Sequence, residues 1–151
     1  MPRVQISKAE SVPFFQPKAD PNDSESGQGS VRLRHPGSDT ELQLLEAKTP
    51  PFENVPVHAH MEDEIIYVLS GELHLGTEVL KAGDSIYVPG MALYSFKAGP
   101  EGLHFINFRR RRDRSYLSKK ELGHIKRLDP DERAEYVDEL IQSKGKQPGF
   151  D

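Results

Sequence analysis

The sequence predicts an all-β fold, one antiparallel sandwich or barrel followed by a short C-terminal α-helical extension. Between residues 31 and 108, short apolar or alternating segments are separated by turn residues, a spacing that is typical of sandwiches and barrels. Beyond residue 113 the apolar residues recur at helical spacing. The chain has 151 residues, enough for one domain, and its 35% of hydrophobic residues places long polar segments outside the core.

We therefore divide the chain into three parts. Residues 1–30 form an N-terminal arm and loop, residues 31–112 the β-barrel, and residues 113–151 the C-terminal helical extension. In the arm, Val12-Pro13-Phe14-Phe15 is an apolar segment that we expect to anchor onto the barrel. Residues 20–30 are rich in turn residues and are expected to be a mobile loop.

The barrel strands are expected where β-branched, aromatic and aliphatic residues cluster between turns. Pro50 and Pro51 end the second of these segments, and Gly76-Thr77 forms a tight hairpin turn. The expected strands are residues 31–34, 41–48, 65–69, 72–75, 79–80, 86–88, 93–96 and 103–108.

Two helices are expected in the C-terminal part. Ser118 has capping-box spacing and opens a short helix that continues through His124. Asp129 caps a second helix with Pro130 at its first position, and Gly145 stops it. One face of this second helix is apolar, which indicates packing against the barrel or a partner; it comprises Ala134, Val137, Leu140 and Ile141.

The strongest functional signal lies at the start of the third expected strand. His58 and His60 share one face of an extended segment, and Glu64 returns to it if residues 61–63 form a short bend. Imidazoles suit Zn, Fe, Ni or Cu, and a carboxylate adds Mn. A surface His-x-His on a polar loop is the alternative, but the apolar run 65–69 that follows places these residues beside a buried strand.

These residues resemble the first cupin motif, Gly-x5-His-x-His-x3,4-Glu-x6-Gly. The match runs from His58 through Gly71, which we expect to end the apolar strand in a turn, and Phe52 stands at the leading glycine. The second motif, Gly-x5-Pro-x-Gly-x2-His-x3-Asn, is matched at Gly83 and Pro89. Its other three positions differ and hold Met91, Tyr94 and Ala98.

The resemblance implies a small RmlC-like jelly-roll barrel with a metal inside it. Its ligands would be His58, His60, Glu64 and Tyr94, which stands where the family has its last metal histidine. We expect one divalent ion, Fe, Mn, Zn or Ni, and catalytic roles for Tyr94 and Glu64. The sequence leaves three roles possible for Tyr94: it ligates the metal, it acts as a general acid or base, or it only fills space in the core. His104 is a less favoured substitute for it as a ligand.

The favoured function is a metal-dependent small-molecule enzyme of the dioxygenase, lyase or isomerase type. The alternative is a non-catalytic ligand-binding or sensor cupin. A metal-free epimerase is the least favoured reading, since His-x-His is intact. The sequence does not identify the substrate, because that depends on which side chains line the barrel. A one-residue shift of strand register would move the candidate liners to the other face of the sheet; these are Arg32, Arg34, Gln43 and Glu46.

Composition narrows the partners. The chain has no cysteine, which excludes disulfides and thiolate metal sites, and its net charge of −4 argues against nucleic-acid binding. No apolar run is long enough for a membrane span and no signal peptide is evident, so we expect a cytoplasmic protein. The basic run from Arg109 to Arg114 is either an anion site or, as we favour, a solvated or intersubunit edge.

A homodimer is the expected assembly. Ile65 and Tyr67 have the parity opposite to Glu64, so they point away from the expected metal site. Apolar side chains on this outer side need cover, from the second sheet, from the Phe14-Phe15 segment or from a partner subunit.

Overall fold

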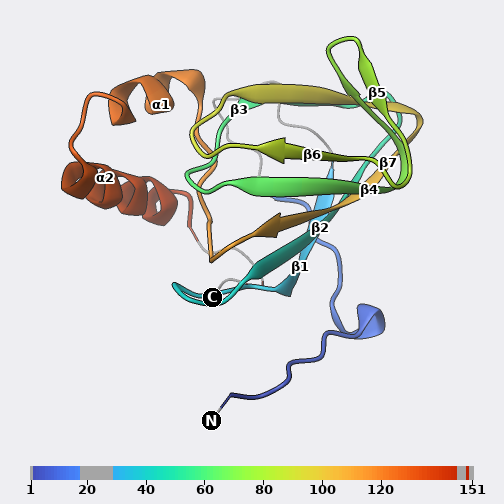
Figure 1. Cartoon of the computed structure of the whole chain (residues 1–151), viewed down its shortest axis with the longest axis horizontal. Coiled ribbons are helices and arrows are strands. Elements are labelled where there is room, and N and C mark those ends of the chain that lie inside the picture. The colour runs from blue at the N-terminus through green and yellow to red at the C-terminus, as the bar shows by residue number, and fades with distance from the viewer. Residues whose placement is uncertain (1, 18–28, 146–148, 150–151) are drawn as a thin grey trace.

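The computed structural model describes residues 2–17, 29–145 and 149 (Figure 1). Most of the expected loop 20–30 lies outside the described residues. In chain order the elements are the 3-10 turn η1 (Ala9–Ser11), β1 (Ser30–His35), β2 (Gln43–Thr49), β3 (Asn54–His58), β4 (Glu64–Leu75), β5 (Glu78–Leu80), β6 (Ser85–Val88), β7 (Tyr94–Arg109), α1 (Lys119–Ile125) and α2 (Pro130–Ser143).

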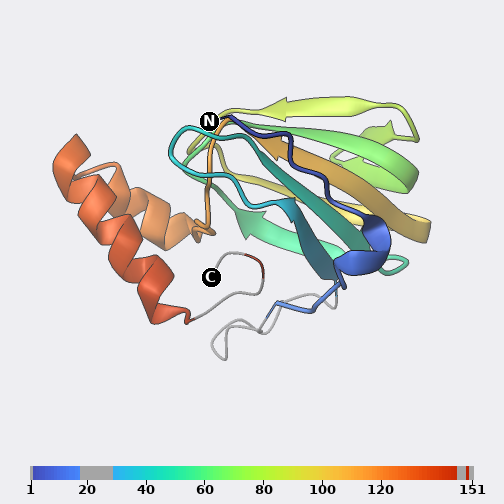
Figure 2. The same cartoon turned by 90° about the horizontal axis from the view of Figure 1, so that it is seen from below.

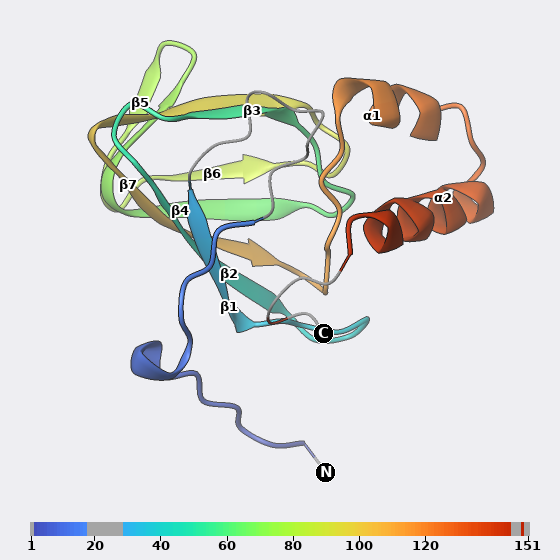
Figure 3. The same ribbon diagram turned by 180° about the vertical axis from the view of Figure 1, so that it is seen from behind.

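The fold is a curled antiparallel sheet with two helices at one end, which confirms the predicted class. The strand order is β1-β2-β7-β4-β5, with β3 also paired to β7 and β6 to β4. The long strands β4 and β7 hold the sheet together, and Figure 3 shows them from behind. The hydrogen-bonded sheet does not close on itself, so the barrel is open between its edge strands.

The strand predictions were wrong at three strands. The sequence missed β3, whose Pro56 is unusual in a strand, and it divided β4 and β7 into two segments each. Gly71 does not end a strand in a turn; it lies within β4 at a bulge, with φ of 75°. A Cβ at Gly71 would lie 2.1 Å from the carbonyl oxygen of Gly102, so only glycine allows β4 and β7 to approach here.

Alternation along the strands separates an inner face from an outer face. The inner face holds one core cluster, formed by Ala47, Ile66, Val68, Leu73, Leu80, Phe96, Ala98, Leu103 and Phe105. Gln43 is buried on this face, as a barrel liner would be. Glu46 has the opposite parity on the same strand and contacts Arg32 and Arg34 of β1 and His104 of β7, so it does not line the barrel.

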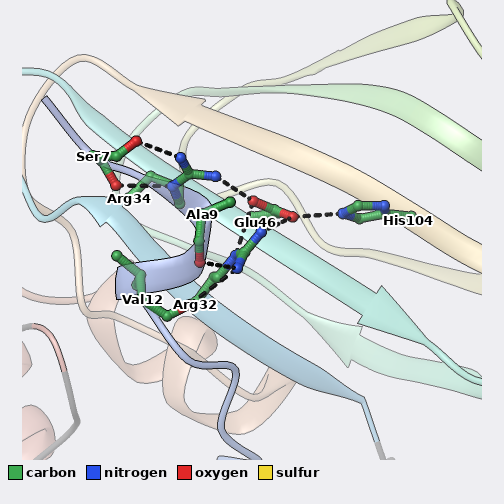
Figure 4. A network of polar contacts seen from close by, with 7 residues as sticks. All are labelled: Ser7, Ala9, Val12, Arg32, Arg34, Glu46 and His104. Atoms are coloured by element: carbon green, nitrogen blue, oxygen red, sulfur yellow. Dashed lines mark hydrogen bonds and ion pairs between the residues drawn. The ribbon is translucent and has the colours of Figure 1, made fainter.

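The N-terminal arm is anchored on the outer face, as predicted for residues 12–15. Phe15 pairs with Val31 of β1. Figure 4 shows the polar network beneath the arm, in which Glu46 binds Arg32 at 2.9 Å and Arg34 at 3.0 Å. Both arginines also donate to the arm, at Ser7, Ala9 and Val12.

Burial acts to raise the pKa of Glu46, but the hydrogen bonds from Arg32, His104 and Arg34 outweigh it and lower this pKa to about 2. His104 lies 2.7 Å from Glu46, so it belongs to the outer network and does not substitute for Tyr94 at the expected metal site.

The helices pack across one end of the sheet (Figure 2). Ser118 and Asp129 form complete capping boxes, and Pro130 occupies the first turn of α2, as predicted. A second core cluster joins them to the barrel and comprises Ala59, Leu117, Leu122, Ile125 and Val137. The backbone bridge between Ala59 and Leu117 fixes the C-terminal segment beside the extended residues 58–60.

Candidate active site

The predicted site residues meet where β3 ends, β4 begins and β7 begins. His58 is the last residue of β3 and pairs in register with Tyr94, the first residue of β7. A bend at residues 61–62 then returns the chain so that Glu64, the first residue of β4, is buried on the inner face. The ring centroids of His58 and His60 are 4.9 Å apart, and those of His58 and Tyr94 are 4.5 Å apart. The structure thus brings all four predicted residues together.

Both histidines have a defined tautomer. Nδ1 of His58 lies 2.7 Å from the carbonyl oxygen of Pro56, and Nδ1 of His60 contacts the carbonyl oxygen of Ser115. A carbonyl oxygen only accepts, so Nδ1 carries the proton in each ring and Nε2 carries the lone pair of the neutral form. Metal-binding histidines are commonly oriented in this way by a second hydrogen bond.

The protein keeps both imidazoles neutral at physiological pH. Burial lowers the pKa of His58, and the nearby charge of Arg109 acts in the same direction. For His60, burial and then the charge of Arg109 lower the pKa to about 3. A neutral ring with Nε2 unprotonated can ligate a metal or accept a proton.

Tyr94 is held protonated beside an ionised Glu64. Its hydroxyl donates to Oε1 of Glu64. Burial, together with the charge and hydrogen bond of Glu64, raises the pKa of Tyr94 far above its ordinary value. Burial also acts to raise the pKa of Glu64, but neighbouring positive charge and the hydrogen bonds from Tyr94 and Asn107 outweigh it and lower this pKa. The positive charges that act on Glu64 are those of His60 and Arg109. Because His60 is neutral at physiological pH, Arg109 supplies this charge there.

Arg109 is the main residue that the sequence interpretation missed. It was grouped with a solvated basic run, yet it is buried, and its Nη2 lies 2.9 Å from Oε2 of Glu64. Its neighbours do behave as expected, because Arg110 and Arg111 bind Glu62 at the surface. Strand parity could have found Arg109, since it shares the inner face with Asn107 and the core residue Phe105.

The segment after β7 fixes the turn that carries the histidines. The carboxylate of Asp113 accepts from the backbone nitrogen of Glu62 at 2.9 Å and of Ser115 at 2.7 Å. The hydroxyl oxygen of Ser115 accepts from the backbone nitrogen of Met61 at 2.8 Å. The contacts of Glu62 with Asp113 and of Met61 with Ser115 join residues more than fifty positions apart, and no local sequence pattern indicated them.

Tyr116 covers the histidines from outside. Its ring is stacked on that of His58, with centroids 4.4 Å apart and planes 9° apart, and it meets His60 edge-on at 5.8 Å. His58 is 3% exposed whereas Tyr116 is 39% exposed, so the tyrosine lies on the solvent side. No motif in the sequence indicated a role for Tyr116.

The donor set fits a divalent metal in part. The two neutral imidazoles fit, since no described residue hydrogen-bonds to Nε2 of either ring. Glu64 does not fit in this arrangement, because its carboxylate faces Arg109, Asn107 and Tyr94. Accordingly, within the described residues no three His, Cys, Asp or Glu side chains are grouped to hold an ion.

Comparison with known proteins identifies the fold. A family model described as Cupin domain matches residues 45–107, which include His58, His60, Glu64 and Tyr94. An RmlC-like cupin from Shewanella frigidimarina is similar at 22% identity and a TM-score of 0.55, over 78% of this chain and 95% of that one. A search of curated protein sequences found no match.

Two further solved structures are similar. The polyketide cyclase RemF from Streptomyces resistomycificus shares 20% identity, with a TM-score of 0.55, over 91% of this chain and 98% of that one. KdgF from a Halomonas species shares 19% identity, with a TM-score of 0.57, over 73% of this chain and 96% of that one. At such identities the likeness establishes the fold alone. None of the described helices is both long and apolar enough to span a membrane.

Proposed function

From the premise that the chain is a single-domain member of the cupin superfamily, we propose that it is a metal-dependent small-molecule enzyme of the lyase or isomerase type. The observation that carries this proposal is the pair of neutral imidazoles, each with Nδ1 committed to a backbone carbonyl and Nε2 available. His58 and His60 would hold one divalent ion, Fe, Mn, Zn or Ni. When bound, the ion would act as a Lewis acid toward a substrate oxygen.

The protonation states favour proton transfer over oxidation. Tyr94 keeps its proton, because burial and the carboxylate of Glu64 raise its pKa. Rotation of its hydroxyl about the C–O bond would turn that proton from Glu64 toward a bound substrate. Eliminations and isomerisations need a positioned acid of this kind. One similar protein is named as a polyketide cyclase and another, from Ruegeria pomeroyi, as a DMSP lyase, so the fold accommodates such enzymes.

Metal content is the first test of this function. Protein purified without an affinity tag should contain or take up about one equivalent of a transition metal, and His58→Ala or His60→Ala should abolish this binding without loss of the β-sheet signal in circular dichroism. Less than about a tenth of an equivalent after reconstitution would count against the proposal.

Activity is the second test. Loaded protein would be assayed for elimination and isomerisation with a panel of small carboxylates, phenols and diketones, and O2 uptake would be followed in parallel. O2 uptake that depends on His58 would replace the lyase or isomerase assignment by a dioxygenase.

The second candidate is a non-catalytic ligand-binding or sensor cupin. The observation in its favour is the saturated carboxylate of Glu64, which holds Tyr94 and Arg109 in a fixed arrangement. Ligand binding without turnover, in protein that carries no metal, would favour this candidate.

A further inference from the structure

The carboxylate of Glu64 has almost no acceptor capacity left for a metal. Oε2 accepts from Nη2 of Arg109 at 2.9 Å, from Nε of Arg109 at 3.2 Å and from the side-chain amide of Asn107. Oε1 accepts from the hydroxyl of Tyr94. A carboxylate offers about four lone-pair positions, so these four hydrogen bonds nearly exhaust it.

Arg109 is fixed in this position by more than its bond to Glu64. Its Nη1 donates to the backbone carbonyl of Asp113 at 3.0 Å, at the start of the segment that covers the site. The side chains of Arg109 and Glu64 are only 6% and 1% exposed. Water therefore screens the guanidinium charge poorly, and the charge acts strongly on any ion brought to His58 and His60.

We propose that Arg109 competes with a divalent metal for Glu64 and thereby sets the metal affinity of the site. This inference rests on the proposed metal position at His58 and His60. With Arg109 in place, an ion meets two imidazoles and a repelling guanidinium. Once Arg109 releases Oε2, the same ion gains a carboxylate ligand and loses that repulsion. Arg109 thus supplies Glu64 with the positive charge that a bound metal would otherwise supply.

The test compares two arginines of the same strand end. Arg109→Gln removes the buried charge but leaves an amide that can still donate to Glu64. Arg110→Gln removes the same charge at a side chain that is 68% exposed and bound to Glu62, so it is the matched control. The affinity for Zn²⁺ and for Mn²⁺ would be measured by titration calorimetry in each variant and in the wild type.

The expected result is a gain of at least about ten-fold in affinity for Arg109→Gln and a change within about two-fold for Arg110→Gln. Arg109→Lys keeps the charge and should stay near the wild type. In Arg109→Gln combined with Glu64→Gln the gain should disappear, because no carboxylate is left to ligate the ion. A folded Arg109→Gln protein that binds metal no tighter than the wild type overturns the inference.

Arg109→Gln leaves Glu64 without its counter-ion, and the variant then depends on metal for its stability. If it is unfolded in chelator, excess Zn²⁺ should restore its β-sheet circular dichroism, because the ion replaces the lost charge. Failure to refold would also overturn the inference.

The proposed function is tested separately by His58→Ala in the Arg109→Gln background. Equal affinity with and without His58 would reject the proposed metal position while leaving the competition for Glu64 intact. His58-dependent binding in the wild type, with no gain in Arg109→Gln, would reject only the competition.

Discussion

Tyr116 lies flat on His58, with ring centroids 4.4 Å apart, and separates this buried imidazole from solvent. Lys144 holds the tyrosine: its ammonium lies 5.9 Å from the Tyr116 ring and donates to the Tyr116 backbone carbonyl at 2.6 Å. Tyr116 therefore covers one face of the His58 ring.

Removal of the Tyr116 ring should expose His58. In Tyr116→Ala we expect diethyl pyrocarbonate to modify His58 several-fold faster than in the wild type, as measured by mass spectrometry of the modified peptide. Tyr116→Phe keeps the stacked ring and should react at the wild-type rate. Equal rates in Tyr116→Ala and the wild type would show that the ring does not control access.

Tyr94→Phe should separate catalysis from packing at the second motif. The variant keeps the ring, which is stacked on Phe96 at 6.1 Å, but loses the hydroxyl that donates to Glu64. We expect a loss of stability of about 1 kcal/mol and, with metal still bound, a loss of turnover of about a hundred-fold or more. Unchanged turnover and unchanged metal affinity would assign Tyr94 to packing alone.

The two positions where this chain lacks a motif glycine retain the backbone of glycine. Phe52 has φ of 62° and Met91 has φ of 66°, and among the described residues no other non-glycine residue has a positive φ. A left-handed conformation costs an L-residue about 1–2 kcal/mol. Phe52 is 60% exposed, so the packing of its side chain offsets little of this conformational energy.

Phe52→Gly should therefore stabilise the protein by about 0.5 kcal/mol, after the greater chain entropy of glycine in the unfolded state is deducted. Phe52→Ala retains the unfavourable φ and should give no gain. Met91→Gly should destabilise instead, because Met91 packs against the cluster of Ala59 and Leu117. Urea unfolding measures all three, and a less stable Phe52→Gly protein would contradict the strain argument.

Local signals in the sequence predicted the elements that local chemistry determines. The capping residues Ser118 and Asp129 set both helix starts, and the spacing of His58, His60 and Glu64 correctly indicated that the three side chains lie together. β3 escaped prediction because Pro56 breaks the usual strand composition. The bulge at Gly71 escaped because it depends on Gly102, on a different strand.

The surroundings of the site were also hard to predict, because they depend on contacts between residues that are distant in the sequence. Ser115 and Tyr116 reach the histidines only because the C-terminal segment folds back over the end of the sheet, and this packing depends on Leu117 and the helices beyond it. Composition also gave a wrong expectation for Arg109. A basic run is usually solvated, whereas Arg109 is paired with Glu64 in the protein interior.

The outer network should give the protein an acid-sensitive stability. The pKa of Glu46 is about 2 in the folded state against an ordinary 4.5, because hydrogen bonds from Arg32, His104 and Arg34 outweigh burial. A folded-state pKa below the unfolded value stabilises the protein fully above about pH 4.5, and this stabilisation is lost as the pH falls toward 2. It amounts to about 3 kcal/mol at most.

Denaturant unfolding from pH 6 to pH 2 should therefore show a smaller loss of stability for Glu46→Gln than for the wild type. Glu78→Gln, on the exposed strand β5, changes the net charge equally and serves as the control. Parallel curves for Glu46→Gln and the wild type would show that the network contributes no acid sensitivity.

We propose that the chain forms a homodimer through the outer face of β4, β6 and β7. Ile65 pairs in register with Phe108 on one side and with Tyr87 on the other, so the three side chains form one continuous patch. They are 44%, 42% and 60% exposed, respectively. A contiguous apolar patch of this kind commonly marks an interface between subunits.

Sedimentation at micromolar concentration should give twice the mass of one chain. Ile65→Lys places a charge at the centre of the patch and should weaken the dimer by at least about ten-fold, because that charge would be desolvated without a partner. Val79→Lys is the matched control, since Val79 is 43% exposed but lies on β5, away from Ile65, Tyr87 and Phe108, and this variant should remain dimeric. A wild-type protein that sediments as a single chain would reject the dimer. A dimer that Ile65→Lys does not weaken would place the interface away from the patch of Ile65, Tyr87 and Phe108.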